Sequence, residues 1–542
     1  MKRKFLFASL FLMGASLVAN AQGYKDGIEY YKVDKLDNAK ELLVRNLNAP
    51  STDKAESFYY LGQIALHQGN VAEAKANFEK GLAADANNPF NYVGKAALAL
   101  KNGDAKGAEE DLKVARKLKK NDPKLEMEIA RAYYDANPTT YAKQIEKCIK
   151  SARKWNADDP DSYIFEADTK ADQKDWGNAA GIYELAFDKD PNNIEAYVKY
   201  ANTYFNVNPE MAIERLEELQ GKVPNSALVQ RELAEKYYED NLGVKAAEQY
   251  GKYIKNPNHF AQDEVRYVQL LFFGEKFQES YELASSLVGK LNPADEKVFY
   301  MKRMQLYNLV QLEKWPEAAE AGKSFFANAL PKGSKYEVRD YTDYGQALQN
   351  AGQPEEAIKY YEKALEVNPK NDELIRFLGD SYADADNFVK AAEYYQRLVD
   401  ANMNKSNDLF TLSNYYLGVA GDENLDAATK ADALNKSQRY IDEVDKLVPG
   451  NVQIVNQKAK IAKFREGENN NGAALSAYKE LLTILDAKED KASYARYFKY
   501  AYNYLATYYF NKGDKSTAKE YYKKWLEYDP ENTNLRKYVE SL

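Results

Sequence analysis

Cysteine and histidine are nearly missing from this chain of 542 residues, which has one Cys and two His. Cys148 has no second cysteine to form an internal disulfide with, so packing alone must hold the chain together. His67 and His259 are far apart in sequence, and each falls near a predicted helix end, which favours surface positions. A zinc site or a Cys–His nucleophile therefore lacks partners, and we predict no metal and no cofactor.

The sequence also lacks convincing β-strands, a glycine-rich phosphate loop and, after its first residues, any apolar run long enough to span a membrane. The first residues differ, because Lys2, Arg3 and Lys4 precede an apolar run over residues 5–18. Small residues follow in Ala19-Asn20-Ala21, which is typical of a signal peptide cleaved before Gln22. A first transmembrane helix fits less well, since the run is shorter than roughly 20 residues. We expect an exported chain, periplasmic and associated with the outer membrane or released.

Excess positive charge is absent as well. The formal net charge is -8, and removing the three lysines and arginines of the signal peptide gives -8 - 3 = -11. An acidic chain is a poor binder of nucleic acid, which proteins hold through clusters of Lys and Arg. The short basic run KLKK, at 117–120, falls on a helix that also carries acids, so it is expected to be a solvated face.

What the sequence does have is a repeat. The segment YGQALQNAGQPEEAIKYYEKALEVNP, residues 344–369, is followed in register by LGDSYADADNFVKAAEYYQRLVD. Small and aromatic residues recur at a step of 34: Gly345 to Gly379, Ala357 to Ala391 and Tyr361 to Tyr395. Apolar residues lie three and four apart within each unit, which predicts a pair of helices joined at a turn such as NAGQ. Small residues let the helices approach closely, and the aromatic covers the crossing.

These offsets resemble the tetratricopeptide repeat, which implies an all-α, right-handed superhelical solenoid without β-sheet. We expect about 14 helix pairs, the first near the mature N-terminus and the others starting near Ala55, Pro89, Lys124, Pro160, Ile194, Ala227, Ala261, Asp295, Val338, Asp372, Ser406, Val452 and Lys499. The expected organisation is a signal peptide (1–21), an N-terminal array (22–330), a hinge (331–337), a C-terminal array (338–531) and a capping helix (532–542).

The resemblance also implies a concave groove lined by positions 2, 5, 9 and 12 of each repeat. Counting these positions gives candidate binding residues with aromatic, amide and charged side chains: Tyr59, Gln63, Val198, Asn202, Phe205, Arg231, Tyr238, Gln269, Phe272, Arg339, Gln346, Arg376, Asp380, Asn503, Thr507 and Phe510. Such a mixture suits an extended peptide or a partner helix. The clamp of Lys, Asn and Arg by which some such proteins hold chaperone C-termini is missing from any three successive repeats.

No catalytic group stands out. Glu and Asp follow the solvent-facing period of the helices, and the acidic stretches 156–162 and 421–426 fit turns and caps better than calcium loops. We therefore predict a non-catalytic scaffold that binds cell-envelope proteins, with outer-membrane assembly or secretion machinery as partners. A glycan- or peptidoglycan-binding protein is the alternative, and an undetected hydrolase is the third. The composition, rich in Lys, Asn and Tyr, resembles that of exported Bacteroidetes proteins.

Overall fold

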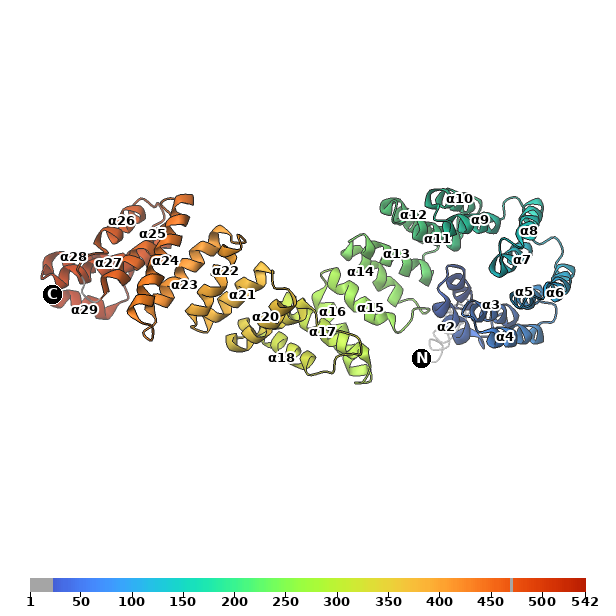
Figure 1. Cartoon of the computed structure of the whole chain (residues 1–542), viewed down its shortest axis with the longest axis horizontal. Helices are drawn as coiled ribbons and strands as arrows, with labels where there is room; N and C mark the ends of the chain where they lie inside the picture. The colour runs from blue at the N-terminus through green and yellow to red at the C-terminus, as the bar shows by residue number, and fades with distance from the viewer. Residues whose placement is uncertain (1–22, 468–470) are drawn as a thin grey trace, which may run out of the picture. The chain divides into compact units, whose positions relative to one another are not determined.

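Helices make up all the regular structure in the residues that the computed structural model describes, 23–467 and 471–542 (Figure 1). The prediction of an all-α repeat fold is confirmed. The predicted signal peptide, 1–21, lies outside the described residues. No described helix is long and apolar enough to cross a membrane. The chain divides into two compact units, with the boundary between Pro293 and Ala294.

The first unit consists of successive helix pairs. Residues 23–32 form the first described helix, which is followed by α2 (Leu36–Asn46). The later pairs are α3 (Lys54–His67) with α4 (Val71–Ala84), α5 (Pro89–Lys101) with α6 (Ala105–Leu118), α7 (Pro123–Ala136) with α8 (Ala142–Trp155), α9 (Pro160–Asp172) with α10 (Trp176–Lys189), α11 (Ile194–Tyr204) with α12 (Pro209–Lys222), α13 (Ala227–Glu239) with α14 (Gly243–Ile254) and α15 (Asp263–Phe273) with α16 (Phe277–Lys290).

The second unit continues the same pattern. Its pairs are α17 (Glu296–Gln311) with α18 (Trp315–Phe326), α19 (Val338–Asn350) with α20 (Pro354–Val367), α21 (Asp372–Asp384) with α22 (Phe388–Asp400), α23 (Ser406–Gly421) with α24 (Ala427–Leu447), α25 (Val452–Glu466) with α26 (Leu475–Asp486) and, after the 3-10 turn η2 (Ala492–Tyr494), α27 (Ala495–Asn511) with α28 (Lys515–Tyr528). A last helix, α29 (Thr533–Ser541), buries Leu535 and Val539 against α27 and α28.

Close helix crossings explain the small residues of the repeat. Gly345 lies so near the ring of Tyr361 that a Cβ atom there would be 2.6 Å from its Cε1 atom. Ala357, Tyr361 and Ala364 are fully buried at the same crossing. Gly379 and Tyr395 repeat the arrangement in the next unit, again with 2.6 Å to the nearest ring atom. The aromatic therefore occupies the space that the missing side chain leaves.

The turns within the pairs use the left-handed backbone conformation. Gly352 has φ of 77° and Gly513 has φ of 82°, which favours glycine because a Cβ atom is strained there. Several repeats have another residue at this position in the same conformation: Lys174, Asn241, Glu275, Glu313 and Asp386, with φ between 54° and 61°. Thus the absence of the turn glycine does not interrupt the helix pairing at these positions.

The segment predicted as a hinge, 331–337, lies inside the second unit and joins α18 to α19. Tyr336 packs against three rings there, with centroid distances of 5.9 Å to Phe299, 5.6 Å to Phe325 and 4.8 Å to Phe326. Arg303 forms an ion pair with Glu337 at 3.3 Å. These contacts fix the segment to α17 and α18 in the described structure, and motion at this place stays a prediction.

The first described helix returns to the far end of its own unit. Its Asp26 accepts a hydrogen bond of 2.8 Å from Asn258, and the ring of Tyr30 meets that of Phe260 edge-on at 5.4 Å. Lys35, in the turn that follows, forms an ion pair with Glu232 of α13 at 3.3 Å. In Figure 1 the blue first helices accordingly lie beside the start of α15. The first unit is thus closed by contacts between residues more than 190 positions apart in sequence.

Candidate functional site

A cavity of about 350 Å³ lies where the first described helix meets α3, α7, α9 and α11. It is lined mainly by polar and charged groups, and carboxylates outnumber cations. The charged lining residues are Lys32, Asp34, Glu128, Arg131, Asp135, Asp161, Asp168, Asp172, Glu195 and Lys199. We call this space the unit-1 cavity.

Glu195 of α11 is the centre of an ion-pair network in the unit-1 cavity. Its carboxylate lies 3.3 Å from the ammonium of Lys199, 3.7 Å from that of Lys32 and 4.0 Å from the guanidinium of Arg131. Lys199 also contacts Asp168 at 2.8 Å, and Arg131 contacts Glu128 at 3.3 Å. Each of these three cations therefore has a carboxylate partner, and one of them comes from the first described helix.

Burial and charge act against each other at these carboxylates. Burial alone would raise the pKa of Glu195, but Lys199, Lys32 and Arg131 outweigh it and hold the pKa below its ordinary value. The pKa values of Asp34 and Asp135 are raised, chiefly by partial desolvation at the cavity, although both residues keep exposed surface. At the contact with Asn258 that helps to close the first unit, burial raises the pKa of Asp26 to about 7. The network thus stabilises the negative charge of Glu195.

The two histidines and the cysteine, whose side chains could act as metal ligands or nucleophiles, make contacts that support the fold. His67 lies 3.3 Å from the hydroxyl of Tyr31 and 3.8 Å from Asp135, and Nδ1 of His259 is 2.7 Å from the carbonyl of Asn256. Burial raises the pKa of the Cys148 thiol to about 12, so it is a poor nucleophile. Among the described residues, no three or more His, Cys, Asp or Glu side chains are grouped to hold a metal ion.

The predicted groove residues of the first unit fall in several places. Gln63 and Asn202 line the unit-1 cavity. Tyr59 is only 1% exposed and donates a hydrogen bond of 2.7 Å to Glu128. Val198, Phe205 and Phe272 are also buried in the described structure, which leaves little of each side chain for a partner.

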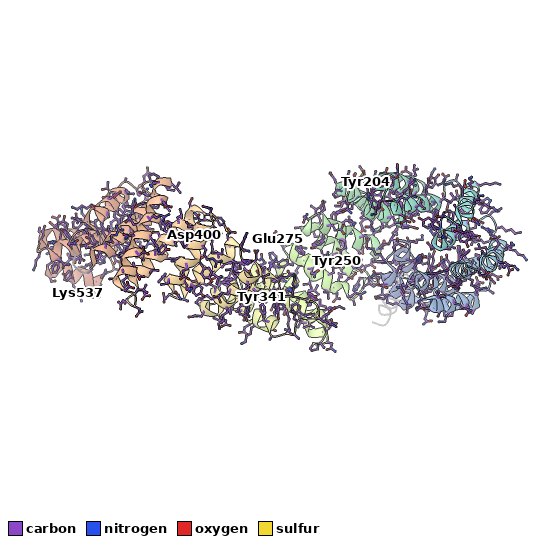
Figure 2. All side chains as sticks on the ribbon, viewed as in Figure 1. Tyr204, Tyr250, Glu275, Tyr341, Asp400 and Lys537 are labelled. Atoms are coloured by element: carbon purple, nitrogen blue, oxygen red, sulfur yellow. The ribbon has the colours of Figure 1, made fainter. Side chains whose placement is uncertain are left out.

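Three further predicted residues lie toward the end of the first unit. Arg231 forms a hydrogen-bonded ion pair with Asp263 at 2.8 Å, next to the closing contact of Tyr30 and Phe260. Tyr238 and Gln269 both contact Arg266, which lies 4.3 Å from the centre of the Tyr238 ring and donates to Gln269 at 3.0 Å. Tyr250 of α14, labelled in Figure 2, stacks on Tyr267 at 5.9 Å and completes this tyrosine-rich end.

The charged groove residues predicted in the second unit contact other residues of the same repeat or of the next one. Arg339 contacts Asp343 at 3.0 Å, and Arg376 contacts Asp408 at 2.9 Å. Asp380 accepts hydrogen bonds from the hydroxyls of Tyr395 at 2.8 Å and Tyr415 at 2.6 Å. Gln346 is half-buried, and Phe510 packs on Tyr538 of α29 at 6.1 Å. These contacts satisfy the charged groups of Arg339, Arg376 and Asp380 within the chain.

Asn503 and Thr507 belong to a second concavity, a pocket of about 300 Å³ between α25 and α27. Its lining is Asn456, Lys460, Lys463, Tyr478, Tyr500, Asn503, Tyr504 and Thr507. We call it the α25–α27 pocket. Its lining contains two ammonium groups and no carboxylate, and the ring of Tyr500 is 47% exposed. This surface can accept an anion and stack against a flat group.

Buried tyrosines hold the wall of the α25–α27 pocket in place. Tyr478 and Tyr504 stack with their ring centres 4.3 Å apart, and the hydroxyl of Tyr504 donates to Glu466 at 2.6 Å. Glu466 also accepts from the backbone N–H of Gly472 at 2.6 Å. Burial would raise the pKa of Glu466, yet these donors, the backbone N–H of Ala474 and the charge of Lys463 together outweigh it and lower the pKa. The carboxylate of Glu466 thus holds Tyr504, and with it the stacked ring of Tyr478, in the wall of the pocket.

Some residues that line the two concavities were not predicted from the sequence, although they stand at the repeat positions expected to face the groove. Positions 2, 5, 9 and 12 of the repeats starting at Lys124, Pro160 and Val452 include Glu128, Asp168, Asn456 and Lys460, which line the two concavities. Applying the rule to every repeat, including the weak ones, would have found them. Lys32 could not be predicted by this rule, because nothing in the sequence pattern indicates that the first described helix returns to α11.

Comparisons with known proteins find one repeat family in three segments of the chain. The family described as "Tetratricopeptide repeat" matches residues 24–89, 343–406 and 500–532. A curated relative, tetratricopeptide repeat protein 21B of Mus musculus, is 41% identical over 58 residues, which is 11% of this chain and only 4% of the mouse protein. Residues 24–89, 343–406 and 500–532 therefore match tetratricopeptide repeats, and the stretch matched by the mouse protein spans a small part of that relative.

Two of the solved structures that match have low sequence identity to this chain. The C-terminal part of a TPR repeat-containing protein from Cytophaga hutchinsonii is 20% identical and covers 50% of this chain and 98% of its own, with a TM-score of 0.39. A thermophilic TPR protein of Thermus thermophilus is 20% identical and covers 38% of this chain and 97% of its own, with a TM-score of 0.26.

Proposed function

We propose that this chain is a non-catalytic protein-binding array whose partner occupies the α25–α27 pocket of the second unit. Tetratricopeptide repeats generally mediate protein–protein interactions through their concave surfaces. The observation that carries the proposal is the composition of the pocket, where exposed aromatic, amide and ammonium groups from two successive repeats face one space. Peptide recognition needs this combination of contact area and hydrogen-bonding groups.

The first unit supports the proposal by contrast. Its first described helix and the turn after it already contact α11, α13 and the turn before α15, and the cations of the unit-1 cavity are paired with carboxylates. A partner that entered there would have to replace these ion pairs. We therefore assign the first unit a structural role and place partner binding in the second unit.

The cellular setting follows from the N-terminal sequence pattern and forms part of the proposal. The basic residues, apolar run and Ala-Asn-Ala of residues 2–21 support export, and the acidic net charge argues against nucleic acid as a partner. We propose a periplasmic chain, associated with the outer membrane, whose partners are proteins of envelope assembly or secretion. Immunoblotting of the chain in cytoplasmic, periplasmic and outer-membrane fractions tests this location.

The test of partner binding uses exposed residues, so that folding is left intact. We expect the double variant Tyr500→Ala/Asn503→Ala to lose the proteins that co-purify with the tagged full chain from its own cells. Phe464→Ala is the matched control, because Phe464 is a 45%-exposed aromatic on α25 outside the pocket lining. Equal loss in the control, or no loss in the double variant, would overturn the proposal.

Glycan binding is a second candidate function, favoured by one feature of the same pocket. The exposed ring of Tyr500 stands beside amide groups, an arrangement that suits stacking on a sugar ring. Quenching of tyrosine fluorescence by envelope glycans, absent in Tyr500→Ala, would support it.

A further inference from the structure

We infer that the α25–α27 pocket takes an acidic peptide segment, with a carboxylate side chain beside Lys460 and Lys463 and a main-chain N–H group on Asn456. This inference rests on the proposed function and names the chemistry of the partner. Three observations support it. Within the described part of the chain, the two lysines form no ion pair, the buried side-chain oxygen of Asn456 accepts no hydrogen bond, and two tyrosine rings hold the lysines in position before a ligand binds.

The charge of the pocket is the first observation. No ion pair within residues 23–467 and 471–542 includes Lys460 or Lys463, although both lie on α25. Lys458 of the same helix shows the usual arrangement, since it contacts both Asp442, at 3.3 Å, and Asp445. The charge of Lys463 lowers the pKa of buried Glu466 on the same helix, but neither lysine forms an ion pair with a described residue. On a chain with more acids than bases, two such cations in one concavity favour an external carboxylate.

Asn456 is the second observation. Its side chain lines the pocket and is 6% exposed, and its Oδ1 atom accepts no hydrogen bond from the described residues. A buried polar atom without a partner is unfavourable, and such atoms in folded proteins call for an explanation. A peptide N–H group that enters the pocket would supply the missing donor. A bare anion would not, which favours a peptide over a free carboxylate or phosphate.

The aromatic wall is the third observation. The ammonium of Lys463 lies 5.4 Å from the ring centre of Tyr504, and that of Lys460 lies 5.9 Å from the ring centre of Tyr500. These rings limit the positions of both cations before a ligand arrives. A pocket already shaped in this way loses less conformational entropy on binding than a flexible surface does.

A binding measurement on the purified full chain tests the inference. The probe is a short fluorescently labelled peptide of alternating Glu and Gly, and the matched peptide replaces Glu with Gln. We expect the Glu peptide to bind and the Gln peptide to bind at least about tenfold more weakly, with an affinity that falls as salt rises. Equal binding of the two peptides would overturn carboxylate recognition.

Two variants locate the binding. Lys460→Gln/Lys463→Gln should weaken Glu-peptide binding about tenfold or more, whereas Lys519→Gln/Lys523→Gln on α28 removes the same charge outside the pocket and should leave it unchanged. Asn456→Ala should weaken binding to both peptides, and since Oδ1 has no partner in the free chain, its melting temperature should change little. Equal effects of the two lysine pairs would overturn the site.

The outcomes also separate this inference from the proposed function. If polygalacturonate binds at the two lysines and the Glu peptide does not, the partner is an anionic glycan and the inference fails. If neither probe binds while Tyr500→Ala/Asn503→Ala still loses its co-purifying proteins, partner binding stands and the acidic chemistry is wrong. If that loss is missing too, the proposed function fails with it.

Discussion

The two units use the concave positions of the same repeat in different ways. In the first unit, Lys199, Lys32 and Arg131 surround the carboxylate of Glu195, and one of these cations comes from the chain's own first described helix. In the second unit, Lys460 and Lys463 stand in a pocket without a carboxylate. The difference teaches that a repeat array can satisfy its polar groups internally in one region and leave them for a partner in another.

The largest expected effect is on the network of the first unit. Glu195→Ala removes the carboxylate that three cations share, and each cation keeps one other acid, so we expect the first unit to lose about 3 kcal/mol of unfolding free energy. Urea unfolding followed by hydrogen–deuterium exchange of α11 measures the loss. Lys189→Ala, which breaks an exposed pair with Asp158, should have no measurable effect. Similar values for both variants would contradict the structural role of the network.

The contact between Asp26 and Asn258, which helps to close the first unit, predicts that the stability of the chain depends on pH. The pKa of Asp26 is raised from 3.8 to about 7, so the folded chain holds a proton that the unfolded chain releases. The contribution of Asp26 to stability is therefore greatest below pH 3.8 and falls as pH rises to about 7. Asp26→Asn keeps an acceptor for Asn258 and should stabilise the chain at pH 8 by about 3 kcal/mol. Parallel melting curves against pH for variant and wild type would disprove this.

Tyr30 allows a finer test of the same contact. Its ring is fully buried against Phe260, but its hydroxyl has no hydrogen-bond partner among the described residues. Tyr30→Phe keeps the ring contact and removes the unpaired hydroxyl, so it should raise the unfolding free energy by about 1 kcal/mol. Thermal unfolding measures it. A clear loss of stability would show that the hydroxyl is bonded.

The second unit should respond least. Lys460 and Lys463 take part in no ion pair of the described residues, so Lys460→Gln/Lys463→Gln should change the unfolding free energy by less than about 0.5 kcal/mol. Urea unfolding of the double variant beside the wild type measures the difference. A loss of several kcal/mol would mean that the two lysines support the fold, as the cations of the first unit do.

The sequence was sufficient for the fold because its spacing is local. Gly345, Ala357 and Tyr361 meet across one helix crossing, and their spacing within a single repeat predicts that contact. The bounds of the pairs follow from Pro and Asn residues near the helix starts, as at Pro160 and Asn371. The same local pattern places Asn503 and Thr507 in a concavity.

The closure of the first unit could not be predicted in this way. The contact of Asp26 with Asn258 depends on how far each repeat turns relative to the last, and small rotations accumulate over the repeats between them. Burial of Phe205 and Phe272 has a similar cause, since repeat position fixes the helix face but not what packs over it. For the same reason the pairing of Arg376 with Asp408 was missed.

The most direct test of the comparison uses one amide in each unit. Asn202 in the unit-1 cavity and Asn503 in the α25–α27 pocket are both exposed, so a photoreactive residue at either position keeps the fold. After irradiation in living cells, we expect protein adducts at 503 and none at 202. Adducts at 202 alone, or equal adducts at both, would contradict the assignment of partner binding to the second unit.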